Sequence, residues 1–303
     1  MKRTGGGAFD PTERNIFFSA GGFSRAAALP EYFLVAVNDL PRRGYETVLD
    51  QHIEAGHKIF LDSGVFNLTN EHKRATGCTM DEALALPPDQ INGFDDLFEQ
   101  YVSIVQRYGN DLWGYIELDQ GGAHHKRRIR ARLEDLGISP VPVYHPIVDG
   151  WDYFDELAEN YDRLCFGNIV QANMATRVRL LHTMWERHRH HPNLWVHILG
   201  MTASEWALTI PPNSCDSSTW VNGLRYPKVD MGYSNLKRIG FLGGEFLYVQ
   251  GDNRSQNSIQ AQEIYRDEME SANAQWHEAV IRVEDVFGAV RYPEPNKREG
   301  VKL

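Results

Sequence analysis

The chain has 303 residues, 42% of them hydrophobic and 24% charged, which is typical of a globular protein and excludes a disordered chain or a fibre. Acidic residues number 41 against 31 lysines and arginines, so the net charge of −10 does not fit a general nucleic-acid coating protein. Any contact with a polyanion must therefore use a local basic patch. The sequence has no long apolar run and no apolar segment behind the N-terminus, so we expect a soluble, cytoplasmic protein without a membrane span.

Eight short runs with strand character recur along the chain, and helical patterns lie between them. The strands are predicted at 15–20, 33–37, 58–61, 113–118, 141–144, 163–166, 194–198 and 213–215, and the helices at 45–55, 94–108, 126–136, 151–161, 175–189 and 202–208. This alternation predicts parallel strands joined by helical crossovers. Eight such units favour an α/β fold of the (β/α)8 TIM-barrel type over an open sheet. We expect one domain over 1–303, with the barrel over about 15–220.

Two stretches depart from the strand and helix alternation. Residues 63–92 form an unusually long connection after the third strand, and a long loop in a compact barrel is often a lid over the active site. Residues 221–303 are expected to form a C-terminal extension with a polar helix near 255–277.

The cysteines predict neither disulfides nor a structural metal. Cys78, Cys165 and Cys215 are odd in number and widely spaced, and no Cys-x-x-Cys pair is present. Free thiols, no metal and no cofactor are the expectation.

Polar and small residues follow several of the predicted strands. Barrel active sites form at the C-terminal ends of the strands, so these residues should meet at one mouth. A single aspartate there could simply cap the next helix, but three aspartates at one rim, with glycine beside two of them, favour chemistry. The residues are Asp62, Ser63, Gly64, Asp119, His145, Gly167, Asn168 and Asp216.

Paired carboxylates across a small site suggest displacement at a sugar carbon. One carboxylate attacks C1′ while another manages the proton of the leaving group, and a third can hydrogen-bond a base. Gly64 and Gly167 would let the backbone approach a planar ligand closely. Phe66 either stacks on that ligand or packs in the core beneath the lid.

Two of these segments resemble a known family. Residues 61–66 (Leu-Asp-Ser-Gly-Val-Phe) resemble the Asp-Ser-Gly-Gly-Phe-Gln segment of tRNA-guanine transglycosylases, and residues 215–220 (Cys-Asp-Ser-Ser-Thr-Trp) resemble the segment that carries their nucleophile. The resemblance implies that Asp216 is the nucleophile, Asp62 the general acid/base and Asp119 the residue that reads the base. It also implies a base pocket that includes Ser63, Gly64, Phe66, His145, Gly167 and Asn168.

The sequence departs from this family in four places. Val65 replaces the second glycine of the first motif, and the glutamine of that motif is Asn67 or absent. His145 stands where the family has a glutamine after the fifth strand, and no cysteine follows Cys215 to build the family's zinc subdomain. The missing zinc site makes the chain similar to the phage-type DNA-guanine transglycosylases, and the His145 substitution leaves open which substituent the base carries. The resemblance then implies DNA and a free 7-deazaguanine base, such as one like preQ0, as partners, and a monomer without metal.

A basic run lies just past the fourth strand. It contains Lys126, Arg127, Arg128, Arg130 and Arg132. Most charge runs are solvated helix faces, but this one starts at the predicted catalytic rim of an acidic protein, which favours contact with phosphates.

Three other functions fit the same residues. A transglycosylase acting on tRNA or on a free nucleoside would use the same aspartates, and a retaining glycoside or nucleoside hydrolase would let water resolve the intermediate. An inert barrel could instead bind a modified base, and it would tolerate loss of Asp216.

Overall fold

A computed structural model describes residues 7–10, 16–20, 31–170, 172–201 and 213–218. All eight predicted strands are confirmed, with ends that differ by a few residues. They form one parallel sheet in the order β4-β3-β2-β1-β8-β7-β6-β5. The strands are β1 (Ile16–Ala20), β2 (Tyr32–Ala36), β3 (Lys58–Asp62), β4 (Gly114–Tyr115), β5 (Val143–Tyr144), β6 (Arg163–Phe166), β7 (Trp195–Ile198) and β8 (Ser214–Ser217).

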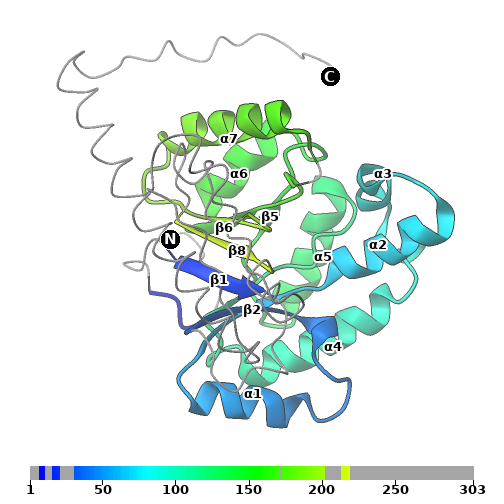
Figure 1. Cartoon of the computed structure of the whole chain (residues 1–303), viewed down its shortest axis with the longest axis vertical. Coiled ribbons are helices and arrows are strands. Elements are labelled where there is room, and N and C mark those ends of the chain that lie inside the picture. Colours follow the sequence, from blue (N-terminus) through cyan, green and yellow to red (C-terminus); the bar gives the residue numbers. More distant parts are fainter. Residues whose placement is uncertain (1–6, 11–15, 21–30, 171, 202–212, 219–303) are drawn as a thin grey trace, which may run out of the picture.

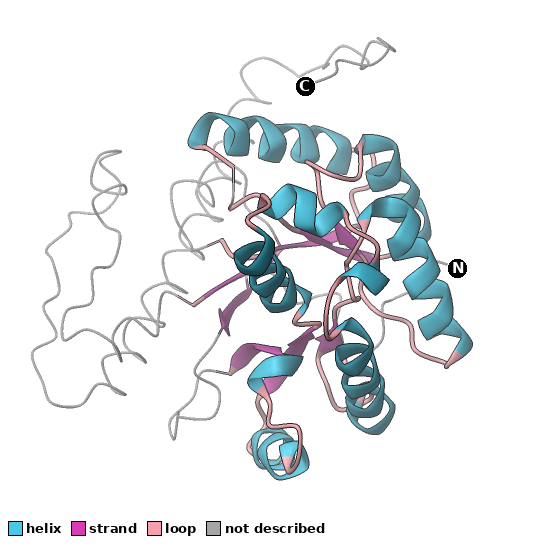
Figure 2. Cartoon of the chain, turned by 90° about the vertical axis from the view of Figure 1, so that its right-hand side faces the viewer, coloured by secondary structure: helices cyan, strands magenta, loops and turns pink. Residues whose placement is uncertain are grey.

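Helices connect the strands and lie around them (Figures 1 and 2). The α-helices are α1 (Tyr45–Glu54), α2 (Val65–Thr76), α3 (Met80–Ala85), α4 (Phe94–Tyr108), α5 (Gly122–Asp135), α6 (Trp151–Asn160) and α7 (Met174–His188), with 3-10 turns η2 (Val37–Asp39) and η3 (Pro88–Gln90). The chain therefore has the α/β architecture that its alternating pattern predicts. The predicted helix at 202–208 and the C-terminal extension lie outside the described residues.

The long connection after β3 is mostly helical, so its prediction as a lid loop was wrong. It contains α2, α3 and η3. Local signals explain both helices. Gly64 takes a left-handed conformation (φ 81°) directly before α2, and Thr79 and Glu82 form a capping box at the start of α3. In that box, the Thr79 hydroxyl accepts the Glu82 N–H (3.2 Å) and the Glu82 carboxylate accepts the Thr79 N–H (2.8 Å).

Alternate residues of each strand face two different cores. On β3, Ile59 and Leu61 pack with the helices α1, α4 and α5, whereas Phe60 packs into a cluster formed by the strands themselves. The strands β6 and β7 alternate in the same way, with Leu164 and Val196 facing α6 and α7. The strand cluster contains Ile16, Phe18, Leu34, Phe60, Trp113, Ile116, Val141, Val143, Cys165 and Trp195.

The segments next to β4 and β5 are hydrogen-bonded to each other. Ile116, just after β4, bridges Val141, just before β5, in a parallel arrangement. The Glu117 N–H donates to the Val141 carbonyl (3.0 Å), and the Val141 N–H donates to the Tyr115 carbonyl (2.8 Å). The two outermost strands of the sheet order are thus connected through these flanking residues.

Candidate active site

The three predicted aspartates lie close enough to affect one another. Asp62 ends β3, Asp119 follows β4, and Asp216 lies within β8. Burial, and then the negative charges of Asp119 and Asp216, raise the pKa of Asp62 from its ordinary 3.8 to about 7. Burial also raises the pKa of the Cys165 thiol in the strand cluster, and the same three carboxylates raise it further. The structure therefore brings the three carboxylates together around one end of the sheet.

Asp119 has a different environment from Asp62 because it has a histidine partner. Its Oδ2 is 2.9 Å from His145 Nε2, and its Oδ1 accepts a longer hydrogen bond from the Ser63 hydroxyl (3.4 Å). Burial alone would raise the pKa of Asp119, but the hydrogen bond and the charge of His145 bring it below its ordinary value. Asp119 is therefore held as an anion, while Asp62 changes protonation state near neutral pH.

The two predicted pocket glycines, Gly64 and Gly167, both lie close to side chains within the chain, and only Gly64 also has a left-handed backbone (φ 81°). A Cβ at Gly64 would lie 2.3 Å from Asn38 Oδ1, and the Asn38 amide donates to the Gly64 carbonyl (3.0 Å). A Cβ at Gly167 would lie 3.0 Å from the His145 ring. Access for a planar ligand at these glycines stays a prediction.

Asn168 and Phe66 occupy different environments beside the site. Asn168 has a left-handed backbone (φ 58°), and its amide donates to Asp81 on α3 (3.1 Å). Its buried Oδ1 has no hydrogen-bond partner among the described residues, and neither has the buried Nδ1 of His145. Phe66, in the first turn of α2, is 46% exposed, so the alternative that it packs in the core was wrong. Its stacking on a base stays a prediction.

The sequence analysis missed a histidine that contacts Asp216. His197 on β7 is fully buried, with Nε2 3.2 Å from Asp216 Oδ1 and Nδ1 2.6 Å from the Ser214 hydroxyl. The Gly200 N–H also donates to Asp216 Oδ1 (2.8 Å). The sequence signal that could have identified His197 is the alternation of side chains along β7. It places His197 on the same side of the strand as Trp195, which belongs to the strand cluster.

Two residues of the basic run are buried, so for Lys126 and Arg130 the prediction of phosphate contact was wrong. Lys126 and Arg130 are one helical turn apart on α5, on the face that packs against the strands. Lys126 pairs with Asp149 (2.7 Å), and Asp149 accepts the His145 N–H (2.7 Å). Lys126 therefore holds the segment that carries His145.

Arg130 forms a second buried network on α5. Its guanidinium donates to both carboxylate oxygens of Glu117 (2.7 and 2.9 Å) and to the Tyr153 hydroxyl (2.7 Å). Glu117 also accepts the Val143 N–H (2.6 Å). Arg130 thus fixes the segments next to β4 and β5, and two parallel hydrogen bonds to one carboxylate are its strongest pairing geometry.

The other three residues of the run lie on the outside of α5. Arg127 is paired with Glu156 (Nε to Oε1, 2.8 Å) and lies over the Tyr153 ring. Arg128 is exposed and makes no ion pair with any described residue. Arg132 lies over the Phe98 ring, with its guanidinium carbon 3.9 Å from the ring centre. Contact of these three side chains with DNA stays a prediction.

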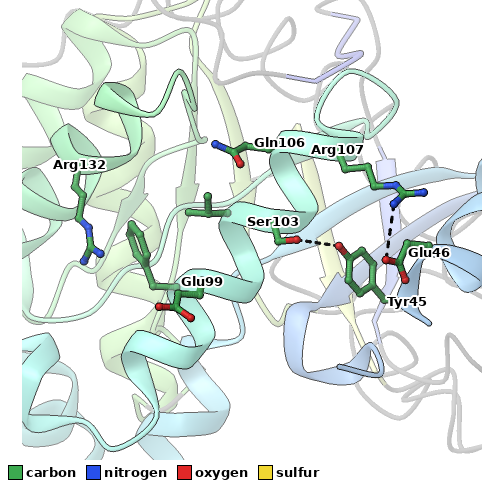
Figure 3. A pocket seen from close by; sticks show the side chains of 9 residues that line it. Tyr45, Glu46, Glu99, Ser103, Gln106, Arg107 and Arg132 are labelled. Carbon is green, nitrogen blue, oxygen red and sulfur yellow. Dashed lines mark hydrogen bonds and ion pairs between the residues drawn. The ribbon is translucent and has the colours of Figure 1, made fainter. Parts of the chain in front are cut away.

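Side chains of α1, α4 and α5 line a groove (Figure 3), and Asp62, Asp119 and Asp216 are not among them. It has a volume of about 630 Å³, and Arg132 is the one predicted site residue among those that line it. In Figure 3 the Ser103 hydroxyl faces the Tyr45 hydroxyl (3.0 Å), and Arg107 reaches Glu46 (3.8 Å). None of the rim residues contributes to this groove.

The described ranges hold no group of three or more histidine, cysteine, aspartate or glutamate side chains placed to bind a metal ion. Cys78, Cys165 and Cys215 form no disulfide with one another. In the same ranges, no helix combines the length and apolar character needed to cross a membrane.

Comparison with known proteins gives no family assignment. No family model matches the chain, and no curated protein matches it. A solved structure titled "Structural study of Project ID from Aquifex aeolicus VF5" aligns with a TM-score of 0.40 and 13% identity, over 84% of this chain and 94% of that chain. A similarity of this size assigns no function.

Proposed function

We propose that this chain is a transglycosylase that exchanges guanine in DNA for a 7-deazaguanine base, with Asp216 as nucleophile and Asp62 as general acid/base. The observation that carries the proposal is a set of three neighbouring carboxylates, of which Asp62 and Asp119 have pKa values shifted in opposite directions. Asp62 has a pKa of about 7, and Asp119 has a pKa below its ordinary value. Such divergent environments are typical of paired acid and base roles.

The reaction would proceed by two displacements at C1′. An oxygen of Asp216 attacks C1′ and forms an ester bond as the bond between C1′ and the guanine nitrogen breaks, and Asp62 gives its proton to the departing base. The incoming base then gives a proton to Asp62 and attacks C1′, which breaks the ester and returns Asp216 to a carboxylate. A pKa of about 7 suits both proton transfers because each form of Asp62 is populated near neutral pH.

Asp119 and His145 would recognise the base. An anionic carboxylate accepts hydrogen bonds from neighbouring N–H groups, and guanine presents two of these on one edge. The His145 contact keeps Asp119 in that acceptor state. The family resemblance implies the same role for Asp119, and its contact with His145 supports that role.

We also propose that the eight strands close into a (β/α)8 barrel. Phe60 on β3 and His197 on β7 have ring centroids 5.2 Å apart, although four strand spacings separate them in the sheet order. In a flat sheet four spacings of about 4.8 Å would separate them by about 19 Å. The Ile116–Val141 bridge between the two end strands supports the same closure.

DNA is the proposed polymer because of the resemblance to phage-type enzymes and because no cysteine follows Cys215. C1′ of a stacked nucleotide is inaccessible to a barrel mouth, so the target guanine must be turned out of the helix or lie in a single strand, at a cost of about a few kcal/mol. Arg127, Arg128 and Arg132 are the exposed cations of the run that offer phosphate contacts to offset this cost.

The test supplies labelled guanine or a 7-deazaguanine together with DNA or tRNA. We expect label to enter DNA, and Asp216→Asn to lower exchange by about four orders of magnitude or more while base binding persists. Asp62→Asn should also lower exchange strongly, and the exposed Asp135→Asn is the matched control that should leave it unchanged.

Each alternative predicts a different outcome. Label that enters only tRNA supports the tRNA-acting enzyme, and release of free base without exchange supports a hydrolase. Base binding that Asp216→Asn leaves intact, with no turnover by the unmodified protein, supports a binding module.

A further inference from the structure

Asp216 has two donors on one of its oxygens. Both His197 Nε2 (3.2 Å) and the Gly200 N–H (2.8 Å) bond Oδ1, whereas Oδ2 is bonded by no donor in the described ranges. An ionised carboxylate only accepts hydrogen bonds, so His197 must carry its proton on Nε2. In the neutral ring with its proton on Nε2, the lone pair on Nδ1 would accept the Ser214 hydroxyl, which lies 2.6 Å away.

The order Ser214, His197, Asp216 does not describe a serine hydrolase. A nucleophilic serine must reach its substrate, but Ser214 is fully buried. Of the three hydrogen-bonded residues, Asp216 is the one nearest to solvent, with 5% of its surface exposed. The three residues therefore direct their hydrogen bonds toward the carboxylate.

Aromatic side chains fix the orientation of the His197 ring. Trp195 stacks parallel to it (6.3 Å, 6°), and Phe18 and Phe60 contact it edge-on at 5.6 and 5.2 Å. This packing leaves the imidazole in one position, with one nitrogen toward Ser214 and the other toward Asp216. The arrangement is pre-organised before any substrate binds.

We propose that His197 is a positioning residue that holds Oδ1 of Asp216, so that Oδ2 attacks C1′, and that Ser214 fixes the His197 tautomer. This inference rests on the proposed function. When the ester forms through Oδ2, the negative charge leaves Asp216 and Oδ1 becomes the ester carbonyl oxygen. When the incoming base breaks the ester, the charge returns to Asp216, and the His197 and Gly200 donors stabilise the departing carboxylate.

The proposed role of His197 predicts unequal effects on formation and breakdown of the covalent adduct, which a merely structural role would not. Donors to Asp216 stabilise the free carboxylate more than the ester, so their loss should slow breakdown of the covalent adduct more than its formation. We expect His197→Leu to slow adduct breakdown about 10-fold, which is the effect of losing one hydrogen bond to a charged group. The fraction of enzyme trapped as adduct should rise while turnover falls.

The experiment isolates the covalent DNA adduct of each variant and follows its breakdown after addition of guanine. His197→Gln, which retains an N–H donor near the position of Nε2, should restore most of the rate, and Ser214→Ala should give a smaller decrease than His197→Leu. Cys215→Ala is the matched control, since Cys215 is a fully buried neighbour on β8 that faces the helices. The adduct of this variant should break down at the same rate as that of the unmodified protein. Equal rates in His197→Leu and the unmodified protein, or a parallel loss of formation and breakdown, would overturn the inference.

A second measurement does not depend on activity. Nitrogen NMR of histidine-labelled protein should show the His197 proton on Nε2, and Ser214→Ala should change this signal. A neutral ring protonated on Nδ1 would overturn the inference even if the enzyme exchanges bases. Absence of any Asp216-dependent adduct in the unmodified protein would instead overturn the proposed function, while the NMR result would still report on the His197 contact.

Discussion

Single residues set the charge of this site through burial and close neighbours. In water all three aspartates would be ionised at neutral pH. In the structure, Asp62 lies among like charges with its pKa raised to about 7, whereas His145 lowers the pKa of Asp119. The same residue type therefore holds a proton in one position and a negative charge in the next, which is what a displacement that moves a proton requires.

Asp62 should make the protein less stable as the pH rises. Its pKa is higher in the folded than in the unfolded chain, so its contribution to stability is complete below about pH 4 and is lost as the pH rises to about 7. Asp62→Asn removes this loss, so the variant should exceed the unmodified protein in unfolding free energy at pH 8 by up to about 4 kcal/mol.

Urea unfolding at pH 4 and pH 8 measures this difference. The two proteins should be closer in stability at pH 4, and Asp135→Asn, an exposed substitution of the same kind, should show little dependence on pH. A gain in stability that is the same at both pH values would contradict the raised pKa of Asp62.

At the scale of one element, α5 has two faces with different functions. Lys126 and Arg130 point inward and hold the segments that carry His145 and Glu117. Arg127 and Arg128 lie on the outside. A helix that starts at the rim therefore stabilises the site with one face and offers cations to solvent with the other.

Substitutions on the two faces of α5 should separate stability from DNA binding. Lys126→Met leaves the buried Asp149 carboxylate without its cation and should cost about 3 to 5 kcal/mol in urea unfolding. The double substitution of Arg127 and Arg128 by Gln removes one exposed ion pair, between Arg127 and Glu156, and one surface charge that makes no ion pair with a described residue, and should change stability by about 1 kcal/mol or less. The double variant should instead bind DNA of every sequence more weakly. The slope of log K against log salt concentration should become less steep by about two units.

The pair Asp152→Asn and Glu159→Gln on α6 is the charge-neutralising control, because it raises the net charge without removing a cation from α5. If the salt dependence is unchanged in the Arg127 and Arg128 variant, the phosphates contact another surface. Free-base binding should be the same in all of these proteins.

For the whole molecule, the proposed closure of the sheet would bring residues that are far apart in the sequence to one site. Asp62 and Asp216 lie on strands separated by two others in the sheet order, yet the charge of one raises the pKa of the other. The C-terminal ends of parallel strands in a closed barrel all face the same mouth. The buried Glu117–Arg130 pair and the Val143 N–H that Glu117 accepts lie beside β4 and β5, the first and last strands of the sheet order.

Hydrogen exchange tests the closed sheet directly. The amides of Glu117 and Val141 should exchange as slowly as those within β3, because they donate to carbonyls across the β4–β5 junction. In an open sheet these amides would lie at free edges and exchange orders of magnitude faster. The amides of the exposed Asp95 and Asp96, in the first turn of α4, serve as the fast-exchanging reference, since neither donates to a backbone carbonyl of a described residue.

The sequence by itself determined the elements and the strand-end residues of this protein. Runs such as 163–166 and 94–108 matched their predicted ends because apolar periodicity and turn residues are local properties of the chain. Asp62 and His145 could be placed at strand ends for the same reason. Local signals for the helices α2 and α3 were also present, in Gly64 and in the Thr79–Glu82 capping box. These helices were not predicted because residues 63–92 were expected to form a lid loop.

Only the tertiary structure decided which polar side chains are buried and with which partners. Lys126 looked like its exposed neighbour Arg127 in the sequence, and the packing of α5 against the strands made it a buried partner of Asp149. His197 acquired its contact with Asp216 because β7 and β8 are adjacent in the sheet. Burial, charge pairing and the resulting pKa values depend on neighbours brought from distant parts of the chain, so no local pattern specifies them.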